Sequence, residues 1–244
     1  MDAQQIAIVL YPGMTALDAI GPYEVLRFVP GAQIRFVGHE PGPVITDSGV
    51  LAVGVTHTFE ETPGPQIIVI PGGPAATSIA ADKRVLNWLK TAHETTIWTT
   101  SVCTGALILA AAGLLDGKPA TTHWAAQGAL ALLGAKPQRD QRIVLADRIA
   151  TAAGVAAGID LALWLVGDTH GQERAEIIQL DIEYDPQPPF DAGHPSKATP
   201  AVRRKALVDQ ARLAPALRRS ETLVTTITGA QRALWRSAIN RIRA

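Results

Sequence analysis

Residues 95–113 read TTIWTTSVCTGALILAAAG, and this stretch indicates a strand, a sharp turn and a helix. Its first eight residues are rich in β-branched and aromatic side chains, which favour strands. From Gly105 onward the residues are small or aliphatic, which is compatible with a helix packed on both sides. Cys103, the only cysteine of the chain, lies at the turn between the two elements.

Cys103 is open to a structural and a catalytic interpretation. A lone cysteine is more often a small buried hydrophobic residue than a reactive group. The start of a helix, however, carries unpaired N–H groups and about half a positive charge, which favours a thiolate. Gly105 lets the helix approach the strand closely, as in a nucleophile elbow. We therefore expect a nucleophilic Cys103 whose pKa lies below the free value of about 8.5.

The rest of the chain up to about residue 185 alternates between strand and helix patterns. Such alternation predicts an α/β fold with a mostly parallel sheet covered by helices on both faces. Residues 41–58 interrupt the alternation and read as a hairpin. The expected strands are 5–10, 33–38, 66–70, 95–102, 120–122, 142–145 and 149–152, and the expected helices are 17–28, 83–93, 105–113, 158–168 and 173–184.

Three candidate features follow the predicted strands of this sheet: Asp18, the pair Gly72 and Gly73, and Cys103. Sites in open α/β sheets form at the carboxyl ends of the strands, so we expect the three to converge. The glycine amides are able to stabilise a developing anion, although a plain turn explains them equally well. Asp18 is either a helix N-cap or a partly buried acid with a raised pKa that exchanges protons with the sulfur.

His123, followed by Trp124, is the histidine best placed to approach Cys103 in space. A core histidine packed beside the tryptophan is an equally good interpretation. The other five histidines show no metal-ligand spacing, and the chain has neither a phosphate loop nor a dinucleotide fingerprint. We therefore expect no metal and no cofactor.

The charge of the chain is unevenly distributed, although its formal net charge is zero. Residues 197–244 carry eleven Lys and Arg against two Asp and Glu, which gives this segment a charge of +9. We expect a catalytic domain over residues 1–195 and a basic helical extension over 196–244. A single cysteine, an N-terminus without a secretory pattern and no apolar run of about 18 residues favour a cytoplasmic protein without a membrane span.

Several motifs resemble those of the ThiJ/PfpI superfamily, also called class I glutaminase-like, over about residues 5–185. Within it, three further stretches are similar to the isonitrile hydratases. The superfamily motifs are IVIPGG at 68–73, SVCTG at 101–105 and ATTHW at 120–124. The hydratase-like stretches are LDAIGP at 17–22, similar at residues 17–18 and 21–22; EPGPV at 40–44 with SG at 48–49; and QLDIEY at 179–184 with PPF at 188–190 and AG at 192–193.

The resemblance implies a flavodoxin-like α/β sandwich, a homodimer with the active site near the dimer contact, and Cys103 as a nucleophile on a strained elbow. It places Asp18 beside the sulfur, where the hydratases have aspartate. Thr104 replaces the histidine that follows the cysteine in peptidase-type members, which argues against proteolysis. Together with the residue-level arguments above, we expect Cys103, Asp18, Thr104 and Gly73 to take part in catalysis, and Gly72 and His123 in substrate binding.

The leading hypothesis is a cofactor-free hydration of an isonitrile, a small-molecule substrate, to an N-substituted formamide. One alternative is a regulatory protein that senses a small molecule or an oxidant through Cys103. We expect no nucleic-acid partner, because the 44 residues after Pro200 are too few for the DNA-binding domain that related regulators carry. A glyoxalase-like activity on 2-oxoaldehydes is the other alternative, since it also needs only a thiolate and a carboxyl.

Overall fold

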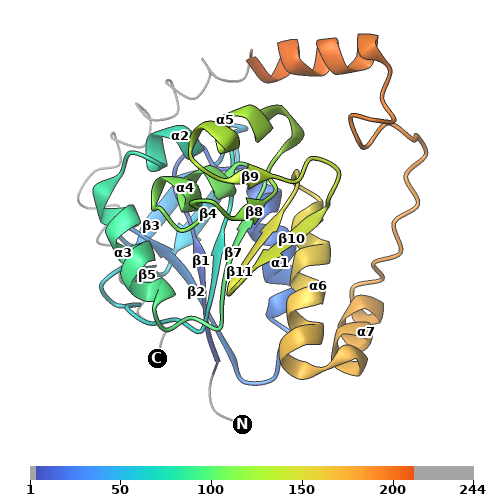
Figure 1. The fold of residues 1–244 in the computed structure, drawn as a ribbon. Helices are drawn as coiled ribbons and strands as arrows, with labels where there is room; N and C mark the ends of the chain where they lie inside the picture. The colour runs from blue at the N-terminus through green and yellow to red at the C-terminus, as the bar shows by residue number, and fades with distance from the viewer. Residues whose placement is uncertain (1–3, 212–244) are drawn as a thin grey trace.

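The structure is a computed structural model that describes residues 4–211. A seven-stranded sheet in the order β10-β11-β7-β6-β1-β2-β5 forms the middle layer (Figure 1). All of its neighbouring strands are parallel except β10, which pairs antiparallel with β11. The strands of this sheet are β1 (Gln4–Val9), β2 (Ala32–Gly38), β5 (His57–Thr58), β6 (Ile67–Ile70), β7 (Trp98–Val102), β10 (Ile143–Ala146) and β11 (Ile149–Ala152).

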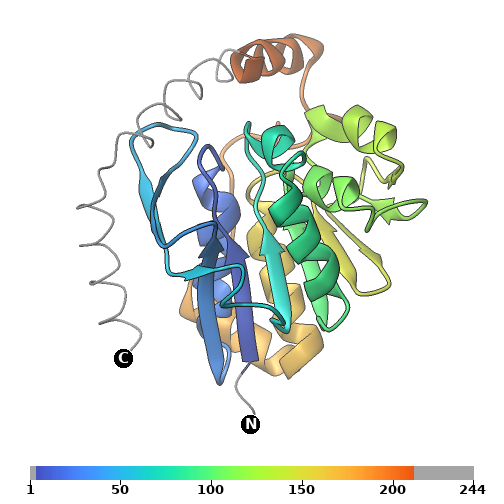
Figure 2. The same cartoon turned by 90° about the vertical axis from the view of Figure 1, so that its left-hand side faces the viewer.

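Helices cover both faces of the sheet, as Figures 1 and 2 show. One face carries α1 (Ala16–Leu26) and α6 (Ala157–His170), with α7 (Gln172–Asp181) packed on α6. The other face carries α2 (Ala76–Ile79), α3 (Lys83–His93) and α4 (Gly105–Ala111). The smaller elements are β3 (Gly42–Ile45), β4 (Ala52–Val55), β8 (Pro119–Ala120), β9 (Lys136–Pro137), the 3₁₀ turn η1 (Trp124–Ala126) and α5 (Gln127–Leu132).

The three central strands β1, β6 and β7 are buried because helices cover them on both sides. All four residues of β6 are at most 1% exposed, in keeping with the uninterrupted apolar run IIVI. Ile6 pairs with Ile67, and Ile67 pairs with Trp98. Because these strands are parallel and adjacent, the loops that follow them meet at one edge of the sheet.

The contact between α1 and α6 depends on two glycines. A Cβ at Gly21 would lie 3.1 Å from Cγ1 of Ile159, and a Cβ at Gly158 would lie 3.3 Å from Cγ of Pro22. Larger side chains at these positions would push the helices apart. The Gly-Pro pair of the LDAIGP stretch therefore serves helix packing, while Asp18 of the same stretch faces the protein interior.

The α/β sandwich with a mostly parallel sheet, expected from the sequence, is confirmed. The hairpin at 41–58 is also confirmed, as the antiparallel pair β3 and β4. The strand expected over 95–102 begins only at Trp98, because the hydroxyls of Thr95 and Thr96 turn back to the carbonyls of Ala92 and His93. The strand expected over 120–122 is present as the two-residue β8, which pairs with β9 outside the main sheet. The short elements β5, β9 and α5 were not predicted, since two to six residues carry too little periodicity.

The basic extension is described only in part. Residues 200–211 are helical, and Nε2 of Gln210 in this helix lies 3.4 Å from Nε2 of His123. Three apolar side chains of this helix, Val202, Leu207 and Val208, are 45–48% exposed, so the helix is not buried on the described body. The remainder of the expected basic helical extension lies outside the described residues. No helix within 4–211 is long and apolar enough to cross a membrane.

Replacing Gly105 by alanine is expected to destabilise the fold by about 3 kcal/mol, because the new Cβ would overlap the carbonyl oxygen of Ile70. Gly128 in α5 is a matched control, since a Cβ there meets no atom within 4 Å. Alanine at 128 should stabilise the protein by about 0.5 kcal/mol by restricting the unfolded chain. Urea unfolding measures both changes. Equal stability of the two variants would refute the close strand–helix contact.

Candidate active site

Cys103 lies on a strained turn between β7 and α4. Its φ is 57°, a left-handed conformation that costs a residue with a Cβ about 1–2 kcal/mol. Three hydrogen bonds hold this conformation. The Cys103 amide donates to the carbonyls of Ala152 (3.2 Å) and Ala153 (2.9 Å), and the Thr122 hydroxyl donates to the Cys103 carbonyl (2.8 Å). The elbow expected from the sequence is therefore present.

The sulfur of Cys103 is enclosed by one carboxyl group and two backbone amides. Cys103 is 5% exposed, and its thiol interacts with the side chain of Asp18. The backbone amides of Thr104 and Val155 lie near the sulfur and favour a negative charge on it. These groups come from the segments that follow β1, β7 and β11.

Asp18 is fully buried in the first turn of α1, and Thr15 occupies the N-cap position of that helix. The helix-cap interpretation of Asp18 is therefore wrong. One carboxyl oxygen, Oδ2, accepts a hydrogen bond of 2.9 Å from the Gly72 amide. The other, Oδ1, is buried and has no hydrogen-bond partner of standard geometry within the described residues. Oδ1 is thus the carboxyl atom available for proton exchange with the thiol or a substrate.

Burial controls the protonation of both groups. It raises the pKa of Asp18 to about 7, although the bonds from Gly72 and the thiol oppose this change. Burial, together with the negative charge of Asp18, raises the pKa of the Cys103 thiol to about 12. The prediction of a lowered thiol pKa is therefore wrong. Helix α4 has only seven residues, and its amides do not outweigh the loss of water around the sulfur.

Asp18 and Cys103 titrate as one coupled pair. Between about pH 7 and pH 12 the pair holds a single proton, given the two pKa values. That proton lies on the sulfur or on the carboxyl, and moving it from sulfur to carboxyl creates a thiolate next to a carboxylic acid. The pair therefore supplies a nucleophile and an acid with one proton transfer.

Thr104 and the two glycines form a clamp beside the elbow. The Gly73 amide donates to the Thr104 hydroxyl (2.8 Å), and this hydroxyl donates to the Gly73 carbonyl (3.0 Å). A Cβ at Gly72 would overlap the Thr104 amide, and Gly73 has a φ of 139°. The expectation that the Gly72 and Gly73 amides are free to stabilise an anion is wrong here, because Asp18 and Thr104 already accept them.

His123 lies in a cleft next to the elbow and does not contact the sulfur in the described structure. Its Nδ1 accepts a 3.4 Å bond from the Ala125 amide, and its Nε2 lies 3.4 Å from Nε2 of Gln210. Burial lowers the pKa of His123 and favours its neutral form. The cleft has a volume of about 420 Å³ and is lined in part by Thr122, His123, Trp124, Gln127, Gly154, Val155 and His194.

Sequence reasoning missed two groups of the site. Val155, with a φ of 33°, contributes its amide to the sulfur. The signal for it was a further strand–turn–helix junction, because α6 follows β11 at the same sheet edge. Tyr11 is 3% exposed and donates its hydroxyl to the Pro71 carbonyl at 2.8 Å. Burial and the nearby charges of Asp18 and Cys103 raise the Tyr11 pKa, so its hydroxyl stays neutral.

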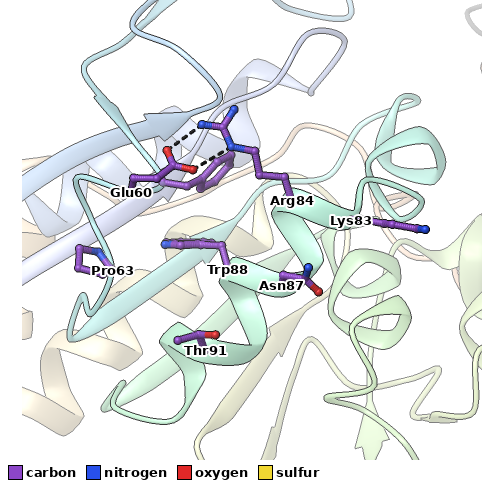
Figure 3. Close-up of a pocket in the computed structure, with 8 residues that line it drawn as sticks. Glu60, Pro63, Lys83, Arg84, Asn87, Trp88 and Thr91 are labelled. Atoms are coloured by element: carbon purple, nitrogen blue, oxygen red, sulfur yellow. Dashed lines mark hydrogen bonds and ion pairs between the residues drawn. The ribbon is translucent and has the colours of Figure 1, made fainter.

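A second depression, of about 580 Å³, lies between the loop after β5 and α3 (Figure 3). Glu60 and Arg84 form an ion pair of 2.7 Å there, and Trp88 contributes its ring to the wall. Both charged side chains are well exposed to solvent. Neither Cys103 nor Asp18 lines this depression, so the buried pair remains the better candidate. Residues 4–211 contain no group of three or more His, Cys, Asp and Glu arranged to hold a metal ion.

Comparisons with known proteins agree with this geometry. The chain is 42% identical over 218 residues to an isonitrile hydratase of Pseudomonas putida, which covers 88% of this chain and 92% of that protein. It is 28% identical over 181 residues to a glutathione-independent glyoxalase of Caenorhabditis elegans, covering 73% of this chain and 96% of the relative.

A solved structure of a ThiJ/PfpI family protein from Pseudomonas syringae has the same fold. It matches with a TM-score of 0.81 at 39% identity, covering 89% of this chain and 91% of that one. The sequence model of the DJ-1/PfpI family matches residues 4–167, a span that contains Asp18, Cys103 and Val155. The chain belongs to the DJ-1/PfpI family.

Proposed function

We propose that this protein is an isonitrile hydratase, which adds water to R–N≡C and releases the formamide R–NH–CHO. The observation that carries the proposal is the contact between the Cys103 thiol and the buried Asp18 carboxyl. The 42% identity to the Pseudomonas putida isonitrile hydratase over most of both chains supports it further. The first step needs a nucleophile and an acid within reach of one carbon atom, and this pair provides both.

In the first step the thiol adds across the terminal carbon of the isonitrile. Asp18 takes the thiol proton while the sulfur of Cys103 forms a bond to that carbon, and Asp18 then gives the proton to the same carbon. The product is a thioimidate, R–N=CH–S–Cys103, and Asp18 is again ionised. The amides of Thr104 and Val155 stabilise the negative charge that develops on the sulfur when it loses its proton.

In the second step water replaces the sulfur. Asp18 accepts a proton from water as the oxygen attacks the thioimidate carbon, and Asp18 then passes this proton to the nitrogen. Loss of the thiolate from the tetrahedral intermediate then gives R–NH–CHO, and the remaining proton returns to the pair. The two steps consume one isonitrile and one water and regenerate Cys103 and Asp18.

The remaining residues of the site position these groups. Thr104 and Gly73 hold each other, and Gly72 holds Asp18 by its amide. His123 and its cleft of about 420 Å³ are proposed to take the R group, because Val155 belongs both to the cleft wall and to the sulfur environment.

We also propose a cytoplasmic homodimer in which residues 1–195 carry the catalysis and 196–244 form the extension. Leu17 is 41% exposed next to Asp18, and Val50 is 89% exposed at the tip of the β3–β4 hairpin. Apolar side chains exposed close to the site are suited to a contact between two copies. The single Cys103 is compatible with a reducing compartment.

Cys103→Ala is expected to lower the rate of hydration of p-nitrophenyl isocyanide by about 10³-fold or more, because the variant lacks the nucleophile. Formamide release, followed by chromatography, measures the rate, and thermal melting checks that the variant is folded. Methylglyoxal is the parallel substrate for the glyoxalase alternative. Equal hydration rates for the wild type and Cys103→Ala would rule out the proposed reaction.

The kcat/KM for hydration is expected to rise with pH and to level off above about pH 7. Below the Asp18 pKa of about 7 the pair holds two protons, so the carboxyl cannot accept the thiol proton. The rate should therefore fall tenfold per pH unit on the acid side. Asp18→Asn should remove this limb and lower the plateau by about 10²-fold or more. A wild-type profile that is flat between pH 5 and pH 8 would contradict this role of Asp18.

A further inference from the structure

The turn of the β3–β4 hairpin reaches the loop that precedes α1, far from it in the sequence. The Gly13 amide donates to the Ile45 carbonyl at 2.9 Å, and the Asp47 amide donates to the Met14 carbonyl at 2.9 Å. Two backbone bonds thus fix the hairpin turn against the segment that leads to Asp18.

A side-chain bond joins the same two segments. The Thr15 hydroxyl donates to Oδ2 of Asp47 at 2.7 Å. Thr15 is the N-cap residue of α1, yet its side chain makes no capping bond to the helix, because the hydroxyl is turned toward Asp47. The Asp47 carboxylate consequently lies near the N-terminus of an 11-residue helix, where a negative charge is stabilised.

From Thr15 a continuous hydrogen-bonded path leads to Asp18. The Thr15 amide donates to the Gly72 carbonyl at 3.0 Å, and the Gly72 amide donates to Oδ2 of Asp18 at 2.9 Å. Gly72 is therefore held by both of its backbone polar groups, between Thr15 at the start of α1 and the Asp18 carboxyl. Asp47 anchors the far end of this path.

We propose that Asp47 is a positioning residue of the active site, which holds Gly72 and the start of α1 through Thr15 and places a second carboxyl group near Asp18. The inference rests on the proposed hydratase chemistry of the Asp18–Cys103 pair. It assigns the hairpin turn a part in catalysis without contact to the substrate.

The charges around Asp18 support the assignment. Burial is the main cause of the raised pKa of Asp18, and repulsion from the Asp47 carboxylate raises it further. Cys103 and Tyr11 are the titratable groups that face Asp18 from the segments after β7 and β1.

The remaining acidic residues of α1 and α6, together with His170 of α6, interact with other side chains. On α6, which packs on α1, Asp160 bonds to Arg142 and Tyr184, Asp168 accepts from Trp98, and His170 bonds to Thr169. On α1 itself, Glu24 pairs with Arg27.

Asp47→Asn removes the negative charge but keeps the hydrogen bond, since the amide oxygen still accepts from the Thr15 hydroxyl. The probe is the rate of Cys103 alkylation by iodoacetamide as a function of pH, which reports one site because the chain has one cysteine. The same pH series of kcat/KM for p-nitrophenyl isocyanide is the second readout. Asp47→Ala removes both charge and acceptor, and Asp181→Asn, exposed at the end of α7, is the control for net charge.

We expect Asp47→Asn to shift the acid midpoint of both profiles down by about half a pH unit. Asp47→Ala should show this shift and a plateau several-fold below that of Asp47→Asn, and Asp181→Asn should show neither. An unshifted alkylation midpoint in Asp47→Asn would overturn the inference. A shifted alkylation midpoint in a protein that does not hydrate isonitriles would support the role of Asp47 while removing the proposed function.

Discussion

The chemistry of the candidate active site depends on one arrangement: the Asp18 carboxyl group lies next to the Cys103 thiol in a place from which water is excluded. Asp18 is 0% exposed and Cys103 is 5% exposed, so burial makes ionisation of both groups less favourable. The negative charge of Asp18 raises the pKa of the thiol further. In water the carboxyl would be fully ionised at neutral pH and the pair would not share a proton. Burial brings the proton affinity of the carboxyl into the neutral range, where it is able to act as acid and as base.

The parallel sheet provides this burial. Strands β1, β6 and β7 end side by side, so Asp18, the Gly72 peptide and Cys103 arrive at one point from segments distant in the sequence. Side chains would block the approach, and therefore glycine occupies 72 and 105. The cost of the left-handed backbone at Cys103 is offset by its bonds to Ala152, Ala153 and Thr122.

The strand–turn–helix pattern around Cys103 and the alternation of strands and helices were sufficient to predict the sheet, the elbow and the meeting of Asp18 with the sulfur. The thiol pKa was not predictable, because it depends on how much water reaches the sulfur and not on the helix that follows it. The hydrogen-bond partners of the Gly72 and Gly73 amides were equally hidden, since a sequence does not show which acceptor a turn will meet. The amide of Val155 gives no side-chain signal at all.

The most direct test of this account is the titration of the Asp18 carboxyl carbon by NMR in protein labelled with ¹³C-aspartate. Asp18→Asn assigns the resonance, and the measurement needs neither substrate nor turnover. The account predicts a midpoint raised to about pH 7, with a second, smaller change when the thiol ionises at higher pH. A midpoint near 4, the value of an ordinary solvated aspartate, would contradict it.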